Sequence, residues 1–242
     1  MCTVTYYKGS NGIFLTSNRD ENISRPDAAL IHQENLNGMT VMYPIDPQAF
    51  GSWFGYRTDK SALVLLNGAF EKHRRIIPYK RSRGLVLLEI LKQPNFNQAW
   101  ENASLEGVEP FSLVAYQHDQ LSFKRWDGEI KYSEELNSEA SHIWSSVTLY
   151  EEEIRNVRKQ WFAEFLSSNT NEKTADDLIS FHTTTGKDNS TDGLVINRDN
   201  VMLTKNITQI SMLEDHAKML HWELLKQEKQ ITEHAYNVEQ VS

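Results

Sequence analysis

The stretch CTVTYYKGSNGIFLTSNRDE, residues 2–21, decides the fold of this chain, and it follows the initiator methionine directly. Residues 2–8 and 13–17 are rich in the β-branched and aromatic side chains that favour strands. Residues 9–12 read Gly-Ser-Asn-Gly, which is turn material. The sequence therefore predicts a β-hairpin over this stretch.

Cys2 is the only cysteine among 242 residues. Methionine aminopeptidase removes Met1 when the next side chain is small, as cysteine is. The mature chain would then carry a thiol and a free α-amine on one residue, and this unit can act as nucleophile and base together. The alternative is that a cysteine at position 2 is accidental.

The hairpin register gives Cys2 its neighbours. A four-residue loop at 9–12 pairs residue 2 with residue 19, so that Arg19 shares the sheet face of Cys2. A two-residue turn at 11–12 would place Glu21 opposite Cys2 instead, with Arg19 still on that face. A nearby cation favours the thiolate, and a carboxylate could orient the α-amine, whose ordinary pKa of about 7.7–8.0 suits a general base. The alternative is that residues 19–21 are only a charged strand end.

Patterning predicts the remaining elements. Strands are expected at residues 39–43, 53–56, 61–66, 111–116, 121–126, 193–197, 201–204 and 208–213. Helices are expected at residues 83–92 and 97–103. Residues 218–225 fit a helix or a strand, and a strand is favoured; the tail from residue 227 onward is polar and expected to be peripheral.

The clearest helix is expected over residues 150–166. Tyr150, Ile154, Val157, Trp161 and Phe165 recur at helical spacing, so we expect them to form one apolar stripe.

A second helix is expected to open with a capping box. Thr174 and Asp177 have the spacing of such a box, with Asp in place of Glu, and the helix would run to about Phe181. His182, at its end, is expected to be a cap or a surface group.

The order of elements predicts an α+β layered fold. Strands, helices, more strands, a long helix and further strands follow one another, without the regular alternation of a doubly wound fold. No repeat, low-complexity block or long linker divides the chain, so residues 1–242 are expected to form a single domain.

Composition excludes several classes of function. The net charge of −8 argues against non-specific nucleic-acid binding. No apolar run is long enough for a membrane span, and the N-terminus lacks the pattern of a secretory signal. A single cysteine cannot form an internal disulfide, which fits a cytoplasmic location. The eight histidines form no recognisable metal motif, and we expect no metal and no cofactor.

One local stretch is basic. Six of the 25 basic residues fall between positions 72 and 83. This stretch could bind an anionic group of a substrate or a polyanion; the alternative is a solvated loop and helix start.

The chain resembles the NRDE family, also called the transport and Golgi organisation 2 family. The motifs that carry the resemblance lie in roughly the first 90 residues, in order: Met1-Cys2, Asn18-Arg19-Asp20-Glu21, Ser24-Arg25-Pro26, Gly51-Ser52-Trp53-Phe54-Gly55, Leu66-Asn67 and Ser82-Arg83-Gly84. The family is similar in turn to the cysteine N-terminal-nucleophile hydrolases, such as penicillin V acylase and bile salt hydrolase.

The resemblance implies an αββα four-layer sandwich and an amidohydrolase. Cys2 would cleave a non-peptide amide or transfer its acyl group, and Arg19 would support the thiolate. Asp20 or Glu21 would meet the α-amine: strand parity favours Glu21, whereas the resemblance favours Asp20. Asn67 matches an asparagine near the oxyanion hole of the related hydrolases, and an asparagine suits that role chemically.

Three further residues are expected to bind substrate: Asn18, Trp53 and Ser146. Ser146 stands where the related hydrolases carry a second oxyanion asparagine, and no arginine precedes Gly193 at the place of a late active-site arginine.

These departures leave a second interpretation open. The chain could be a non-catalytic carrier of the same fold, for haem or an acyl-lipid ligand. The partner expected under the first interpretation is a small-molecule amide or acyl substrate, and a homo-oligomer is possible.

Overall fold

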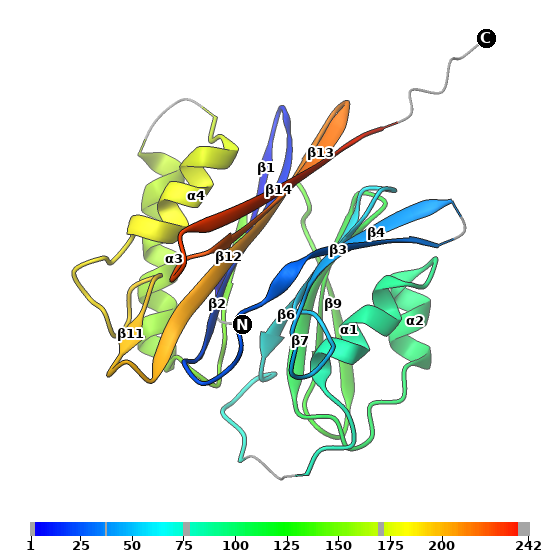
Figure 1. Cartoon of the computed structure of the whole chain (residues 1–242), viewed down its shortest axis with the longest axis horizontal. Helices are drawn as coiled ribbons and strands as arrows, with labels where there is room; N and C mark the ends of the chain where they lie inside the picture. The colour runs from blue at the N-terminus through cyan, green and yellow to red at the C-terminus, as the bar shows by residue number, and fades with distance from the viewer. Residues whose placement is uncertain (1–2, 37, 75–77, 169–171, 237–242) are drawn as a thin grey trace.

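The computed structural model describes residues 3–36, 38–74, 78–168 and 172–236. Two antiparallel sheets pack face to face, and a pair of helices covers the outer face of each (Figure 1). The layers follow the order helix, sheet, sheet, helix. The predicted αββα sandwich is therefore confirmed.

The first sheet contains the N-terminal hairpin. Its order is β10-β1-β2-β12-β13-β14, and a short β11 pairs with β12. Its strands are β1 (Thr3–Gly9), β2 (Gly12–Asn22), β10 (His142–Ser145), β11 (Asn197–Arg198), β12 (Met202–Leu213), β13 (His216–Glu223) and β14 (Glu228–Ala235).

The second sheet is a meander in which each strand pairs with the next along the chain. Its strands are β3 (Ala29–Leu36), β4 (Met39–Ile45), β5 (Phe54–Arg57), β6 (Ser61–Asn67), β7 (Phe111–Gln117), β8 (Gln120–Trp126) and β9 (Lys131–Leu136).

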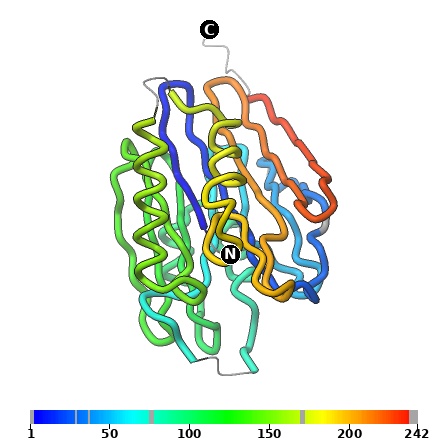
Figure 2. Tube along the Cα trace, turned by 90° about the vertical axis from the view of Figure 1, so that its left-hand side faces the viewer, coloured from blue at the N-terminus to red at the C-terminus, as the bar shows by residue number. Residues whose placement is uncertain are grey.

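Four helices in the described chain form the outer layers. The helices α1 (Arg83–Leu91) and α2 (Phe96–Asn102) lie against the second sheet, and α1 packs on β5 and β6. The helices α3 (Glu152–Ser167) and α4 (Ala175–Thr184) lie across the first sheet (Figure 2). In the described part of the chain, no helix has the length and apolarity needed to cross a membrane.

Two apolar cores hold these layers together. The larger one joins the facing sides of the two sheets and continues beneath α1. The smaller one lies between the first sheet and the helices α3 and α4, and its centre is formed by Tyr7, Phe14, Phe162, Leu178, Phe181 and Leu194.

The hairpin register follows the first of the two predicted alternatives. Lys8 pairs with Ile13, and Thr3 pairs with Asn18. The alternative prediction, a two-residue turn at positions 11–12, is therefore wrong. Gly12 has φ +149°, and a Cβ there would lie 2.4 Å from the carbonyl oxygen of Met212, so this corner requires glycine.

Two predictions fail in the second half of the chain. Residues 193–196 form no strand, because this segment is folded as turns in which Gly193 N–H donates to the Asn189 carbonyl and Leu194 N–H to the Thr185 carbonyl. The strands expected at 201–204 and 208–213 are one strand, β12, with a bulge between Thr204 and Asn206.

The polar tail contains one further strand. Residues 228–235 pair with β13 as the edge strand β14, whose residues are exposed or half-buried, so this part of the tail lies at the periphery as expected. Ile231 is the only large apolar residue of this strand, which therefore lacks the hydrophobic alternation that marks a half-buried strand.

The predicted stripe on α3 is wrong in detail. The fully buried positions of this helix are Arg158 and Phe162, whereas Val157 is 38% exposed. The helix thus turns a different face inward from the one predicted, because the buried guanidinium of Arg158 hydrogen-bonds Thr3 of β1 and the Gly193 carbonyl. The capping box is confirmed, since Thr174 and Asp177 satisfy each other's backbone N–H groups at the start of α4.

Candidate active site

Arg19 is a buried cation on the face of β2 that looks toward the second sheet. Its guanidinium carbon lies 4.5 Å from the centre of the Trp53 ring. Nη2 lies 3.0 Å from Asp46 Oδ2 and 3.3 Å from Glu21 Oε2. Nη1 is buried and has no hydrogen-bond partner in the described part of the chain. Arg19 is thus held from several sides, with one N–H group left for a further partner.

Asp46 is the main anchor of this cation. Arg25 contributes a second guanidinium, 2.8 Å from the same carboxylate oxygen. Burial of the carboxyl acts to raise its pKa, but the hydrogen bond from Arg25 and the charges of Arg25 and Arg19 outweigh it and hold the pKa of Asp46 below its ordinary value. The carboxylate therefore stays ionised beside Arg19.

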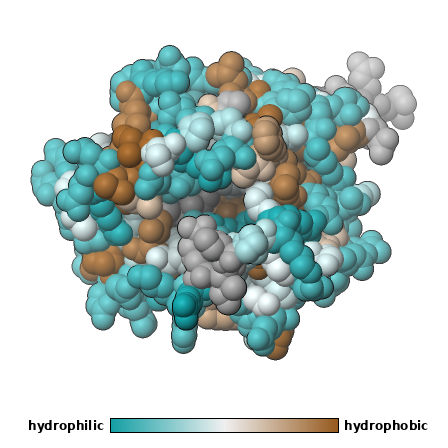
Figure 3. Space-filling model, turned by 60° about the horizontal axis from the view of Figure 1, so that its bottom comes forward, coloured by the Kyte–Doolittle hydropathy of each residue, from teal (hydrophilic) through white to brown (hydrophobic). Residues whose placement is uncertain are grey.

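The family motifs converge on one cavity of about 100 Å³. It is lined by Arg19, Glu21, Arg25, Asp46, Ala49, Gly51, Ser52, Trp53, Leu65, Asn67, Ser82, Arg83 and Gly84. Figure 3, in which the bottom of the molecule in Figure 1 is turned forward, shows a hollow near the centre of that face with hydrophobic surface inside it. The fold thus brings residues from between positions 19 and 84 of the sequence together near the end of β6.

Close backbone packing explains the glycines of these motifs. A Cβ on Gly51 would lie 2.5 Å from the backbone of Gly84, and a Cβ on Gly55 would lie 2.2 Å from Leu91 Cδ2. Ser52 N–H also donates to the Gly84 carbonyl at 3.2 Å. Glycine at these positions lets α1 approach β5 closely, which brings the Ser82-Arg83-Gly84 segment to the cavity.

Asn18 and Asp20 lie on the other face of β2, toward the helices. The amide nitrogen of Asn18 donates to the carbonyls of His182 and Leu194, and its oxygen accepts from His182 Nδ1. The carboxylate of Asp20 accepts hydrogen bonds from Tyr150 and Thr204, each at 2.5 Å. Strand alternation thus separates Asn18 and Asp20 from Arg19 and Glu21.

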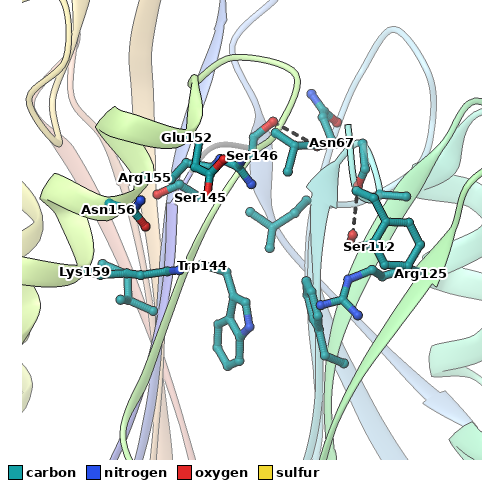
Figure 4. A pocket seen from close by; sticks show the side chains of 17 residues that line it. Asn67, Ser112, Arg125, Trp144, Ser145, Ser146, Glu152, Arg155, Asn156 and Lys159 are labelled. Carbon is teal, nitrogen blue, oxygen red and sulfur yellow. Dashed lines mark hydrogen bonds between the residues drawn. The ribbon is translucent and has the colours of Figure 1, made fainter. Parts of the chain in front are cut away.

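Asn67 connects the Arg19 cavity with a second, larger cavity. It ends β6, and its carbonyl accepts a hydrogen bond of 2.9 Å from Ser146 Oγ. The second cavity, of about 230 Å³, lies between the ends of β6 and β10 and the first turns of α3 (Figure 4). Ser146 lines it too, while its hydroxyl is already engaged with Asn67 and Thr148.

Cys2 lies outside the described residues. The described ladder ends with Thr3 opposite Asn18. The catalytic role of Cys2, like the roles of the other candidate residues, stays a prediction. The structure brings Arg19, Glu21, Trp53 and Asn67 together around one cavity, and it places Asn18 and Asp20 behind the strand that carries Arg19.

Sequence reasoning missed Arg158. It is fully buried, and its guanidinium donates to Thr3 Oγ1 at 2.6 Å and to the Gly193 carbonyl at 2.6 Å. Its Cζ also lies 3.5 Å from the ring centre of Tyr150. Arg158 therefore ties β1, the 192–193 turn and the Asp20 partner Tyr150 together. An arginine within a helix gives no sequence signal of such a role.

The expectation for His182 is wrong. The imidazole is completely buried, with Nδ1 at Asn18 and Nε2 2.8 Å from Thr5 Oγ1. Burial, with a smaller contribution from the charge of Arg158, lowers its pKa to about 3. His182 is therefore a neutral structural link between α4 and the hairpin.

Three of the six cations in the basic stretch have acidic partners. Lys80 pairs with Glu106, Arg81 with Glu89 at 2.5 Å and Arg83 with Glu109 at 3.2 Å. In the chain as described, no group of three or more His, Cys, Asp or Glu side chains is arranged to hold a metal ion.

Solved structures share this fold. An ortholog of N-acylethanolamine-hydrolyzing acid amidase from Caenorhabditis elegans aligns with a TM-score of 0.62 and 11% identity, over 86% of this chain and 92% of that chain. A mutant conjugated bile acid hydrolase from Clostridium perfringens aligns over 98% of this chain and 97% of that chain, with 10% identity and a TM-score of 0.49. The first likeness establishes the fold alone, which is that of the N-terminal-nucleophile hydrolases.

Sequence comparison identifies the family. No curated protein matches the sequence significantly. The model of the family Transport and Golgi organisation 2, in contrast, matches residues 1–230. The chain belongs to the Transport and Golgi organisation 2 family.

Proposed function

We propose that this protein is an N-terminal-nucleophile amidohydrolase that uses Cys2 after removal of Met1. One observation carries the proposal: the β1–β2 ladder pairs Thr3 with Asn18. The sequence prediction that places Arg19 opposite residue 2 uses this same register. Arg19 is buried, and its Nη1 lacks a partner among the described residues, which suits a cation that supports a thiolate.

The chemistry would run in two steps. The thiol of Cys2 loses its proton to the α-amine of the same residue and attacks an amide carbonyl, with the carbonyl electron pair moving to oxygen. The α-ammonium returns the proton to the leaving amine as the C–N bond breaks. Water, deprotonated by the α-amine, then attacks the thioester carbonyl; the C–S bond breaks, the acid is released, and the α-ammonium returns the proton to the Cys2 sulfur. Asn67 is the proposed donor to the oxyanion in both steps.

Asp20 is the better candidate to orient the α-amine. The resemblance to the related hydrolases, in which a carboxylate on the second strand serves the nucleophile, favours Asp20 for this role. Its carboxylate is buried and held by two hydroxyl donors, Tyr150 and Thr204. Glu21 is paired with Arg19 instead, so its proposed role is to hold the cation.

Two measurements test this function. Intact-mass spectrometry of the purified protein is expected to show the loss of Met1; a retained methionine would put the nitrogen of Cys2 into an amide and rule out the mechanism. A panel of N-acyl amides is expected to yield free acids and a transient acyl adduct on Cys2. Cys2→Ala is the matched control and is expected to form neither.

A second candidate function is a carrier of the same fold, for haem or an acyl-lipid ligand. It is favoured by the hydroxyl of Ser146, which is engaged with the Asn67 carbonyl rather than directed to an oxyanion. Loss of one oxyanion donor costs about 10²–10³ in rate in other enzymes. Tight ligand binding without acylation of Cys2 would favour the carrier.

A further inference from the structure

The larger cavity beside Asn67 combines an apolar wall with a basic rim. Its wall includes Leu66, Ile143 and two aromatic rings, Phe123 and Trp144, which stack 5.5 Å apart. Figure 4 shows the indole of Trp144 between the side chains of α3 and those of the second sheet. Such a wall suits an apolar group and offers it two flat faces.

The rim carries three cations. Arg155 and Lys159 come from one face of α3, four residues apart, and Arg125 comes from β8 on the other side (Figure 4). Like charges at this helical spacing destabilise an isolated helix. Two cations placed together in a chain of net charge −8 therefore call for a reason in function.

These two helix cations lack acidic partners. Within the described ranges neither Arg155 nor Lys159 forms an ion pair, whereas Arg125 pairs with Glu134 at 3.1 Å. Arg155 Nε is moreover buried and has no hydrogen-bond partner among the residues that the structure describes. Glu152 is the carboxylate that lines the same cavity, so its lining side chains carry an excess of positive charge. An anion would satisfy the Arg155 donor and relieve the repulsion between the two cations.

We propose that this cavity binds the part of the substrate beyond the amide bond, and that it selects an aryl or short-chain group bearing a carboxylate. The assignment to a substrate rests on the proposed function, because Asn67 lines both this cavity and the Arg19 cavity. The size argues for a small group: a cavity of about 150 Å³ holds benzene, and this one measures about 230 Å³. The apolar part would lie on Trp144, and the carboxylate would meet Arg155 and Lys159.

Calorimetric titration tests the site directly. The probes are 4-phenylbutyrate and its neutral amide, 4-phenylbutanamide, and the protein is the full chain with Cys2→Ala. We expect saturable binding of the carboxylate and at least tenfold weaker binding of the amide. Arg155→Gln and Lys159→Gln, singly and together, should weaken the carboxylate progressively, at least tenfold for the pair, and leave the amide unchanged.

The controls separate this site from charge and folding effects. Lys72→Gln removes one positive charge at an exposed position outside the cavity and should bind both probes as the parent does. Lys159 is also exposed, so its variant should fold normally even if the double variant does not. Equal binding of the two probes, no binding of the carboxylate, or full binding by folded Lys159→Gln would each overturn the proposal.

The test does not depend on catalysis. Because Cys2→Ala removes the nucleophile, failure to bind would leave the acylation test of the proposed function untouched. Failure of acylation would equally leave a measured carboxylate site in place.

Discussion

The guanidinium of Arg19 lies over the indole of Trp53, with 4.5 Å between Cζ and the ring centre. Both side chains are buried, at 3% exposure each. A cation held between an aromatic face and the carboxylates of Asp46 and Glu21 has little freedom to move. Its orientation is therefore set before any ligand arrives, as a group that stabilises a thiolate requires.

Replacing Arg19 should change the reactivity of the thiol. Arg19→Gln removes the cation, so we expect the pKa of the Cys2 thiol to rise toward its ordinary value of about 8.5 and alkylation by iodoacetamide at pH 7 to slow roughly tenfold. Because Cys2 is the only cysteine, the pH profile of alkylation reports on it alone. Arg19→Lys keeps the charge and should retain most of the reactivity. Identical profiles for the parent and Arg19→Gln would show that Arg19 does not act on the thiol.

Substitution of the two carboxylates of the motif, Asp20 and Glu21, should slow acyl-adduct formation to different extents. Asp20→Asn keeps the shape of the side chain but removes its charge, and we expect acyl-adduct formation to fall by about 10² or more, as when the orienting carboxylate of a triad is lost. Glu21→Gln should cost less than about tenfold, because Asp46 still holds Arg19. Rapid-quench mass spectrometry of the adduct measures both rates. The reverse order of effects would assign the α-amine to Glu21.

The N-terminal half of the site was predictable because its signals are local. A Gly-Ser-Asn-Gly turn between two β-rich segments predicts a hairpin with two possible registers, and the structure has the one that pairs Thr3 with Asn18. In either register, strand alternation places Arg19 and Asp20 on opposite faces. The convergence of distant motifs on Asn67 could be expected from the family resemblance. Their spacing alone does not predict it.

The other features of the site and the fold depend on tertiary contacts, which leave no periodic signal in the sequence. Asp46 follows β4 with nothing to mark it as the anchor of Arg19. The orientation of α3 is decided by Arg158, whose polar contacts outweigh the apolar stripe that contains Val157. His182 is polar by type yet completely buried, since Thr5 and Asn18 satisfy both of its ring nitrogens.

The buried face of α3 can be tested by stability. Arg158→Met keeps an apolar stem but leaves Thr3 and the 192–193 carbonyls without their donor. We expect the free energy of unfolding to fall by about 2–4 kcal/mol. Val157→Ala on the exposed side should change it by less than about 1 kcal/mol. Urea denaturation measures both, and a larger loss for Val157→Ala would restore the apolar stripe as the buried face.

His182 should make the protein less stable in acid. In the folded protein burial holds its pKa at about 3, whereas in the unfolded chain it should be near 6.5. Between these values the unfolded chain binds a proton that the native protein does not, so the free energy of unfolding falls as the pH drops below about 6.5. From pH 7 to pH 5 the loss from this residue is about 2 kcal/mol. The variant His182→Gln has no titrating group at this position. Its free energy of unfolding should therefore fall by about 2 kcal/mol less than that of the parent between pH 7 and pH 5, even if the variant is the less stable protein at pH 7. Urea titrations of both proteins at the two pH values give the comparison, and equal losses would mean that His182 is protonated in the native state.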